Sequence, residues 1–143
     1  MNWGLIGIGG ALALAAAGSA IGIGTAGMAA IGAWKKCYAQ NKPAPFMLIA
    51  FTGAPLTQTL YGFILMNNLR DKLGTMDPGL LLGLGVLGGL AMGYSAAFQG
   101  KAGAAAADAL AETGKGTAQY LIVLGIVETV AVFVLVFMMG VTG

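Results

Sequence analysis

Residues 120–139 read YLIVLGIVETVAVFVLVFMM, an apolar span that contains a single carboxylate, Glu128. At a rise of 1.5 Å per residue, about 20 residues cross a hydrocarbon core of roughly 30 Å. Glu128 has eight residues of this span before it and eleven after it, so it lies near mid-membrane. A charge at that depth costs roughly 2.5–3.5 kcal/mol, and intramembrane acids therefore usually face protein and handle ions or protons. We interpret Glu128 as functional, against the alternative of a protonated side chain that only joins two helices.

The composition agrees with a membrane location for the whole chain. Of 143 residues 58% are hydrophobic, the mean hydropathy is +0.86, and only seven basic and five acidic residues are present. The net charge of +2 is too small and scattered for nucleic-acid binding. One cysteine and no histidine argue against a transition-metal site. No basic residue precedes the first apolar stretch, so we expect the first span to be retained. The short chain without targeting elements suits a prokaryotic cell membrane.

Clusters of charges and turn formers divide the chain into four predicted helices. We expect an all-α membrane protein with two tandem helical hairpins, the first over residues 1–72 and the second over residues 73–143. The first and third helices are longer than a bilayer requires, so one end of each should project into water. The predicted helices cover residues 4–34, 45–69, 79–110 and 117–140.

The two hairpins are related by an internal repeat. Residues 18–27 (GSAIGIGTAG) align with residues 94–103 (YSAAFQGKAG) at an offset of 76. Residues 56–65 (LTQTLYGFIL) align with residues 126–135 (IVETVAVFVL) at an offset of 70. The repeat places Gln58 opposite Glu128, so the first hairpin carries an uncharged amide where the second carries the acid.

Three polar side chains are predicted to meet at one depth. In an antiparallel hairpin, residues equidistant from the turn lie at the same level, and the midpoint of Gln99 and Glu128 falls within the turn at residues 112–116. Gln58 reaches the same level because its partner in the first hairpin, Ile23, is the repeat counterpart of Gln99. The structural alternative is that the glutamines only bridge helices.

Neighbouring groups extend this set of oxygen donors. Thr57 adds a hydroxyl beside Gln58, although threonine in a membrane helix commonly bonds its own backbone. Pro55 should loosen the helix around residues 51–54 and free a carbonyl. Several hard oxygens with one negative charge suit Na⁺, whereas H⁺, the alternative, needs only the carboxylate and one acceptor. Tyr61 lies on about the same face, where its hydroxyl could hold the Glu128 carboxylate.

At this point the chain resembles a known family, the proteolipid ring subunit of V-type and related rotary ATPases. The resemblance is to the subunit K type with two fused hairpins, and to its sodium-type members. It covers essentially the whole chain and rests on the Gly/Ala-rich first helix and three motifs. These motifs are PLTQTLY at residues 55–61, FQGKAG at residues 98–103 and GIVET at residues 125–129.

The resemblance implies a role for each site residue. Glu128 would be the ion-carrying carboxylate, Tyr61 would hold it in place, and the ligands would be Thr57, Gln58, Gln99 and the backbone oxygen of Ala54. It also implies a ring of about ten copies with closed cyclic symmetry, a stator membrane subunit with an essential arginine, central-stalk subunits, and surrounding lipid. The chain itself would catalyse no bond chemistry, since the soluble head hydrolyses or makes ATP.

Two other functions compete with this interpretation. A small four-helix proton-coupled multidrug exporter is also built around one membrane glutamate, but there the acid lies in the first helix among aromatic residues. A structural scaffold that assembles through glycine faces would leave Glu128 unexplained. Basic residues are slightly enriched in the first and third loops, which favours both termini outside. Lys101, close to the predicted site, is expected to extend toward the interface.

Overall fold

The computed structural model describes residues 2–143, and all of their regular structure is helical. Four segments are long and apolar enough to cross a membrane, and the second of them is made of α2, a 3₁₀ turn η1 and α3. The prediction of an all-α protein with four membrane spans is therefore confirmed. The elements are α1 (Trp3–Ala39), α2 (Leu48–Gly53), η1 (Ala54–Leu56), α3 (Thr57–Asp71), α4 (Pro78–Thr113) and α5 (Thr117–Thr142).

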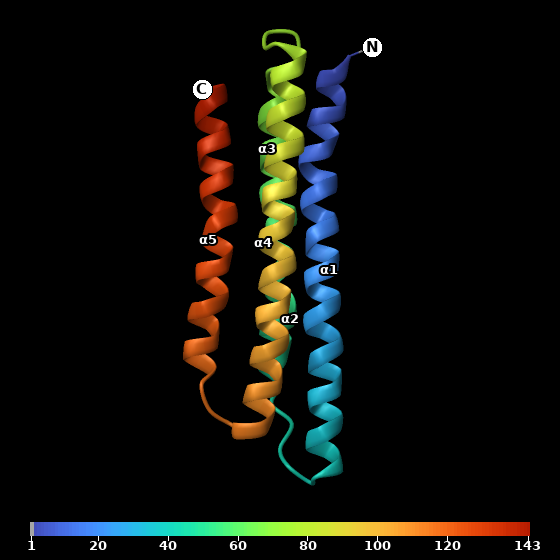
Figure 1. The fold of residues 1–143 in the computed structure, drawn as a ribbon, viewed down its shortest axis with the longest axis vertical. Helices are drawn as coiled ribbons and strands as arrows, with labels where there is room; N and C mark the ends of the chain where they lie inside the picture. The colour runs from blue at the N-terminus through green and yellow to red at the C-terminus, as the bar shows by residue number, and fades with distance from the viewer. Residues whose placement is uncertain (1) are drawn as a thin grey trace.

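The helices form an elongated bundle in which α1 and α4 run parallel to each other (Figure 1). The α1–α4 contact is the most extensive in the fold, and α3 and α5 each contact both α4 and one another. Both chain ends and the α3–α4 connection lie at one end of the bundle, whereas the other two connections lie at the opposite end (Figure 1). The α3–α4 connection, residues 72–77, contains the predicted boundary between the two hairpins.

Glycine allows α1 and α4 to touch along their backbones. A Cβ atom built on Gly18 would overlap the backbone of Gly93, and one on Gly100 would overlap the backbone of Gly22. Lipid gives helices no hydrophobic reason to associate, so membrane helices gain from dispersion contacts that small residues permit. Because α1 and α4 lie so close, they form one tightly packed pair; α3 contacts both helices of this pair, and α5 contacts α4 and α3.

Pro55 interrupts the second membrane span next to the predicted site. A proline has no N–H to donate, and its ring clashes with the preceding turn of a helix. The chain accordingly leaves the α-helix at Gly53, makes the 3₁₀ turn Ala54–Leu56, and resumes as α3 at Thr57. The carbonyl of Ala54 accepts a hydrogen bond from the Thr57 hydroxyl at 3.1 Å as well as one from its backbone N–H.

The predicted ends of the first and third helices are wrong by several residues. The first helix continues past residue 34 to Ala39, and the third continues past residue 110 to Thr113. Charged side chains end an apolar membrane span, but they are fully compatible with a helix that continues into water. The helices end instead where the backbone turns: Asn41 has φ +51°, and Gly114 has φ +65° and donates its N–H to the Leu110 carbonyl at 2.8 Å.

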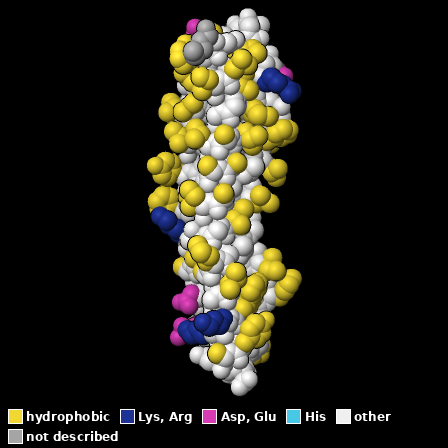
Figure 2. Space-filling view, turned by 90° about the vertical axis from the view of Figure 1, so that its right-hand side faces the viewer, with side chains coloured by type: hydrophobic (Ala, Val, Ile, Leu, Met, Phe, Trp, Pro, Cys, Tyr) yellow, Lys and Arg dark blue, Asp and Glu magenta, His cyan; other side chains and the backbone are white. Residues whose placement is uncertain are grey.

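Apolar side chains spread over most of the length of the molecular face drawn in Figure 2, with the charged side chains mainly toward its two ends. Many large apolar side chains are more than half exposed, including Ile126 at 66% and Phe137 at 68%. Such a surface is stable only against lipid or other protein.

Candidate functional site

Glu128 lies on α5, half-buried, and both of its carboxylate oxygens are held by neutral donors from other helices. The Tyr61 hydroxyl, on α3, donates to Oε1 at 2.7 Å. The Gln99 amide nitrogen, on α4, donates to Oε2 at 3.2 Å. The two salt bridges among residues 2–143 lie elsewhere, between exposed side chains near helix ends. The carboxylate is thus positioned by three helices without a cationic side chain to neutralise it.

Gln99 and Gln58 are both completely buried and connect the three helices through their amides. Gln99 donates a second hydrogen bond to the Leu124 carbonyl on α5 at 2.9 Å. Its Oε1 accepts a hydrogen bond from the Gln58 Nε2 at 2.9 Å. The Thr57 hydroxyl lies 3.2 Å from the Gln58 Oε1 and so extends the series to the first residue of α3. Thr57, Gln58, Gln99, Glu128 and Tyr61 therefore form one continuous network.

The structure places all of the sequence-predicted site residues in this network, but not all of them next to the acid. Tyr61 and Gln99 contact Glu128 directly, whereas Gln58 reaches it through Gln99. Thr57 and the Ala54 carbonyl are one step further along, because the single hydrogen of the Thr57 hydroxyl is shared between the Gln58 Oε1 and that carbonyl. Whether these oxygens hold an ion stays a prediction.

Ser95 is a member of the network that the sequence did not reveal. It lies on α4 one helical turn before Gln99 and is 7% exposed. Its hydroxyl donates to the Val127 carbonyl at 2.9 Å and accepts a hydrogen bond from the Gln58 Nε2 at 3.4 Å. It thereby attaches α5 at the residue before Glu128 and holds the second amide hydrogen of Gln58. The available signal was its position four residues before Gln99, because such residues share a helix face.

The equivalent place in the first hairpin lacks this network. Ser19, the repeat counterpart of Ser95, is buried at 2% exposure, but its hydroxyl has no hydrogen-bond partner among residues 2–143. Ile23 stands where the second hairpin has Gln99, and Gln58 where it has Glu128. The repeat therefore produces one polar site per chain.

Lys101 is not part of the network. Its side chain is exposed on α4, and its ammonium group lies 4.6 Å from the centre of the Phe98 ring. A cation over an aromatic face is stabilised by the ring quadrupole. The lysine is therefore accommodated by a neighbour on its own helix, away from the acid.

Comparisons with known proteins give two matches. Residues 82–140, which comprise most of α4 and α5 with Gln99 and Glu128, match the family model of the ATP synthase C-subunit. The chain is also 32% identical over 131 residues to the A-type ATP synthase subunit K of Methanocaldococcus jannaschii. That alignment covers 91% of this chain but 57% of the relative, so the chain spans little more than half the relative's length.

Proposed function

From these two similarities, we propose that this chain belongs to the C-subunit family of ATP synthases and is a rotor-ring component of an ion-translocating rotary ATPase. In this role it catalyses no reaction itself, and it carries a cation across the membrane on Glu128. Several copies, about ten by the family resemblance, close into a ring in a prokaryotic cell membrane with both termini outside. A stator protein with an essential arginine would load and empty the acid, and central-stalk subunits would couple rotation to the soluble head.

The observation that carries this proposal is the way Glu128 is held. A carboxylate near the middle of a membrane span is stable as an anion only with strong hydrogen bonds or a bound cation. Here the acid receives hydrogen bonds from Tyr61 and Gln99 and has no basic partner among the described residues. A bound cation would cancel its charge, so the loaded ring could rotate past lipid.

We favour Na⁺ as the cargo because of the number of oxygens within the network. Gln99 directs both amide hydrogens at oxygens of α5, one on Glu128 and one on the Leu124 carbonyl. Half a turn of this amide, with a matching half turn of the Gln58 amide to keep their mutual hydrogen bond, would exchange its nitrogen and oxygen and leave the oxygens of Gln99, Glu128 and the Leu124 carbonyl facing one another. Such a group repels itself unless a cation lies within it, and hard oxygen ligands suit Na⁺. A proton would need no such rearrangement.

Labelling with a hydrophobic carbodiimide tests both the site and the cargo, since this reagent reacts with protonated carboxyl groups in membranes. In the purified oligomer we expect modification at Glu128 and at no other acid. Increasing Na⁺ at constant pH and ionic strength should slow the reaction, whereas K⁺ at the same concentration should not. Labelling without protection by Na⁺ at any pH would identify a proton carrier, and no labelling at Glu128 would exclude the site.

Replacing Ser95 by alanine should weaken Na⁺ binding moderately. The substitution removes a part-buried hydrogen bond to the Val127 carbonyl and a buried one from Gln58, together worth about 1 kcal/mol. The Na⁺ concentration that halves carbodiimide labelling should therefore rise roughly 5- to 10-fold. Ser95→Thr keeps the hydroxyl and should recover most of the affinity.

Ser19→Ala provides the matched control for this experiment, because Ser19 is the repeat counterpart of Ser95 and is also buried. Its hydroxyl has no hydrogen-bond partner within residues 2–143, so its removal should leave the Na⁺ midpoint unchanged. Equal effects of the two alanine substitutions would mean that Ser95 acts only through general packing.

A further inference from the structure

The internal repeat relates α1 to α4, and the two helices also lie against each other in register. Residues of α1 contact α4 close to their own repeat counterparts: Gly18 touches Gly93, and Lys36 forms a 3.2 Å salt bridge with Glu112. The sequence separations of these pairs are 75 and 76, against a repeat offset of 76. The two helices are therefore parallel, with equivalent residues at equal depth.

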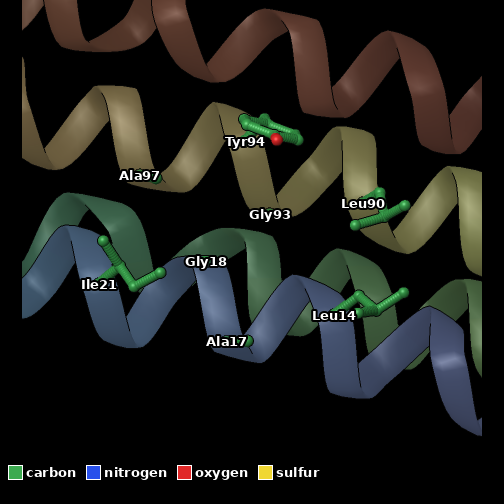
Figure 3. Close-up of a pocket in the computed structure, with 8 residues that line it drawn as sticks. All are labelled: Leu14, Ala17, Gly18, Ile21, Leu90, Gly93, Tyr94 and Ala97. Atoms are coloured by element: carbon green, nitrogen blue, oxygen red, sulfur yellow. The ribbon is translucent and has the colours of Figure 1, made fainter.

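A groove between these two helices shows the same relationship (Figure 3). It has a volume of about 240 Å³ and is lined by four residues from each helix. Each residue on one helix is the repeat counterpart of a residue on the other, 76 positions away. The four pairs are Leu14 and Leu90, Ala17 and Gly93, Gly18 and Tyr94, and Ile21 and Ala97.

An arrangement of this kind leaves two open faces that match. The α4 face that covers α1 is buried, whereas its repeat counterpart on α1 is exposed. The small-residue face that packs against a helix on α4 is thus also present on α1, where it is exposed. The buried residues are Gly85, Gly89, Ala96 and Gly100, and their exposed counterparts are Gly9, Ala13, Ala20 and Gly24.

The complementary open face lies on α4. The residues of α1 that meet α4 most closely include Gly18 and Gly22. Their counterparts on α4 are Tyr94 and Phe98, which are 66% and 54% exposed. Figure 3 shows Tyr94 standing at the edge of the groove. The open face of α4 thus carries large aromatic rings, whereas the open face of α1 carries only small residues, which leave space for such rings.

We propose that the open α4 face of one chain packs against the open α1 face of the next copy in the ring, with Tyr94 and Phe98 as the inserted side chains. The residue pairs follow when each residue of a within-chain contact is replaced by its repeat counterpart: the α1 residue by its counterpart on α4, and the α4 residue by its counterpart on α1 of the next copy. The Gly18–Gly93 contact becomes Tyr94 against Ala17 of the next copy. The contacts of Gly22 with Ala96 and Gly100 become Phe98 against Ala20 and Gly24 of the next copy.

Two consequences follow from the sizes of these residues. Backbones touch between α1 and α4 of one chain, but two aromatic rings separate α4 from the next α1. The α1 and α4 helices of successive copies should therefore alternate between close and wider spacings around the ring. At the loop end, Glu112 would lie between Lys36 of its own chain and the same lysine of the next copy, so the acid could serve both.

The proposed interface rests on the ring role proposed above. Cysteine cross-linking tests which residues it pairs. In a Cys37→Ser background, Ala20→Cys and Phe98→Cys are introduced together, and the assembled oligomer is treated in a mild detergent with a short thiol-specific bifunctional cross-linker, because the wider spacing can exceed the reach of a direct disulfide. We expect a ladder of covalent multimers on a denaturing gel, and the same for the pair Ala17→Cys with Tyr94→Cys. Either single-cysteine variant should give no ladder.

A depth-mismatched pair is the matched control. Leu87 lies on the same open face of α4 but 11 residues from Phe98, or about 16 Å along the helix, so Ala20→Cys with Leu87→Cys should not cross-link. An intact oligomer in which neither expected pair forms a ladder would overturn the interface and leave the rotor role standing. A monomeric protein in native mass measurements would overturn both.

Discussion

Replacing Glu128 by glutamine is expected to reduce ion transport by the assembled ATPase to background, while the ring still assembles. Glutamine has nearly the same shape and keeps an oxygen that can accept the Tyr61 hydroxyl. Its side chain is always neutral, so it carries no charge that a cargo ion could neutralise. Cation binding and release at this position are therefore lost. The measurement is ²²Na⁺ uptake into vesicles that contain the purified complex, together with the ATP hydrolysis rate.

The control for this experiment is Asp108→Asn, which removes an exposed carboxylate from α4 far from the network. It should transport at the normal rate. Glu128→Gln should also lose all carbodiimide labelling, so the same preparation reports on the site independently of transport. Sustained Na⁺ uptake by a complex whose ring carries only Glu128→Gln would rule out Glu128 as the carrier.

The depth of the site could be predicted from the sequence because depth depends only on helix rise and turn position. Glu128 and Gln99 are equidistant from one turn, and the structure joins them by a 3.2 Å hydrogen bond. The error at the end of the third helix does not affect this level, since the turn of the second hairpin still lies between Thr113 and Thr117, about midway between Gln99 and Glu128. Length and hydropathy therefore determine which residues can meet.

The rotation of each helix about its axis could not be predicted in the same way. Ser95 was visible only as a repeat match, since a serine in a membrane helix often bonds its own backbone. Its hydroxyl instead reaches α5 because the close α1–α4 contact turns that face of α4 toward α3 and α5. Equally, the sequence has 25 glycines but does not indicate which of them lie at a helix–helix contact. Side-chain packing between helices determines both the rotation of each helix and the glycines at the contact.

Gln99→Leu is expected to have the second-largest effect, because Gln99 joins all parts of the site. Leucine fits the volume but removes the hydrogen bonds to Glu128 and to the Leu124 carbonyl, and it leaves the Gln58 amide without its shortest acceptor. Each buried group left unsatisfied costs about 1–3 kcal/mol. A loss of about 3 kcal/mol in the ion-bound form would raise the Na⁺ concentration for half-protection roughly 100-fold.

Thr129→Val is the matched control for this substitution, since it removes a polar group directly beside the acid. The Thr129 hydroxyl bonds the Gly125 carbonyl of its own helix at 2.8 Å, and the residue is exposed. It should therefore leave the Na⁺ midpoint within about twofold of the original value, less than about 0.5 kcal/mol. If Gln99→Leu kept normal Na⁺ protection in an intact oligomer, the amide would be structural and the cargo would need no ligand from α4. A normal midpoint for Thr129→Val alongside a large shift for Gln99→Leu would instead locate the ion between α4 and α5, on the side of Glu128 that faces the buried amides.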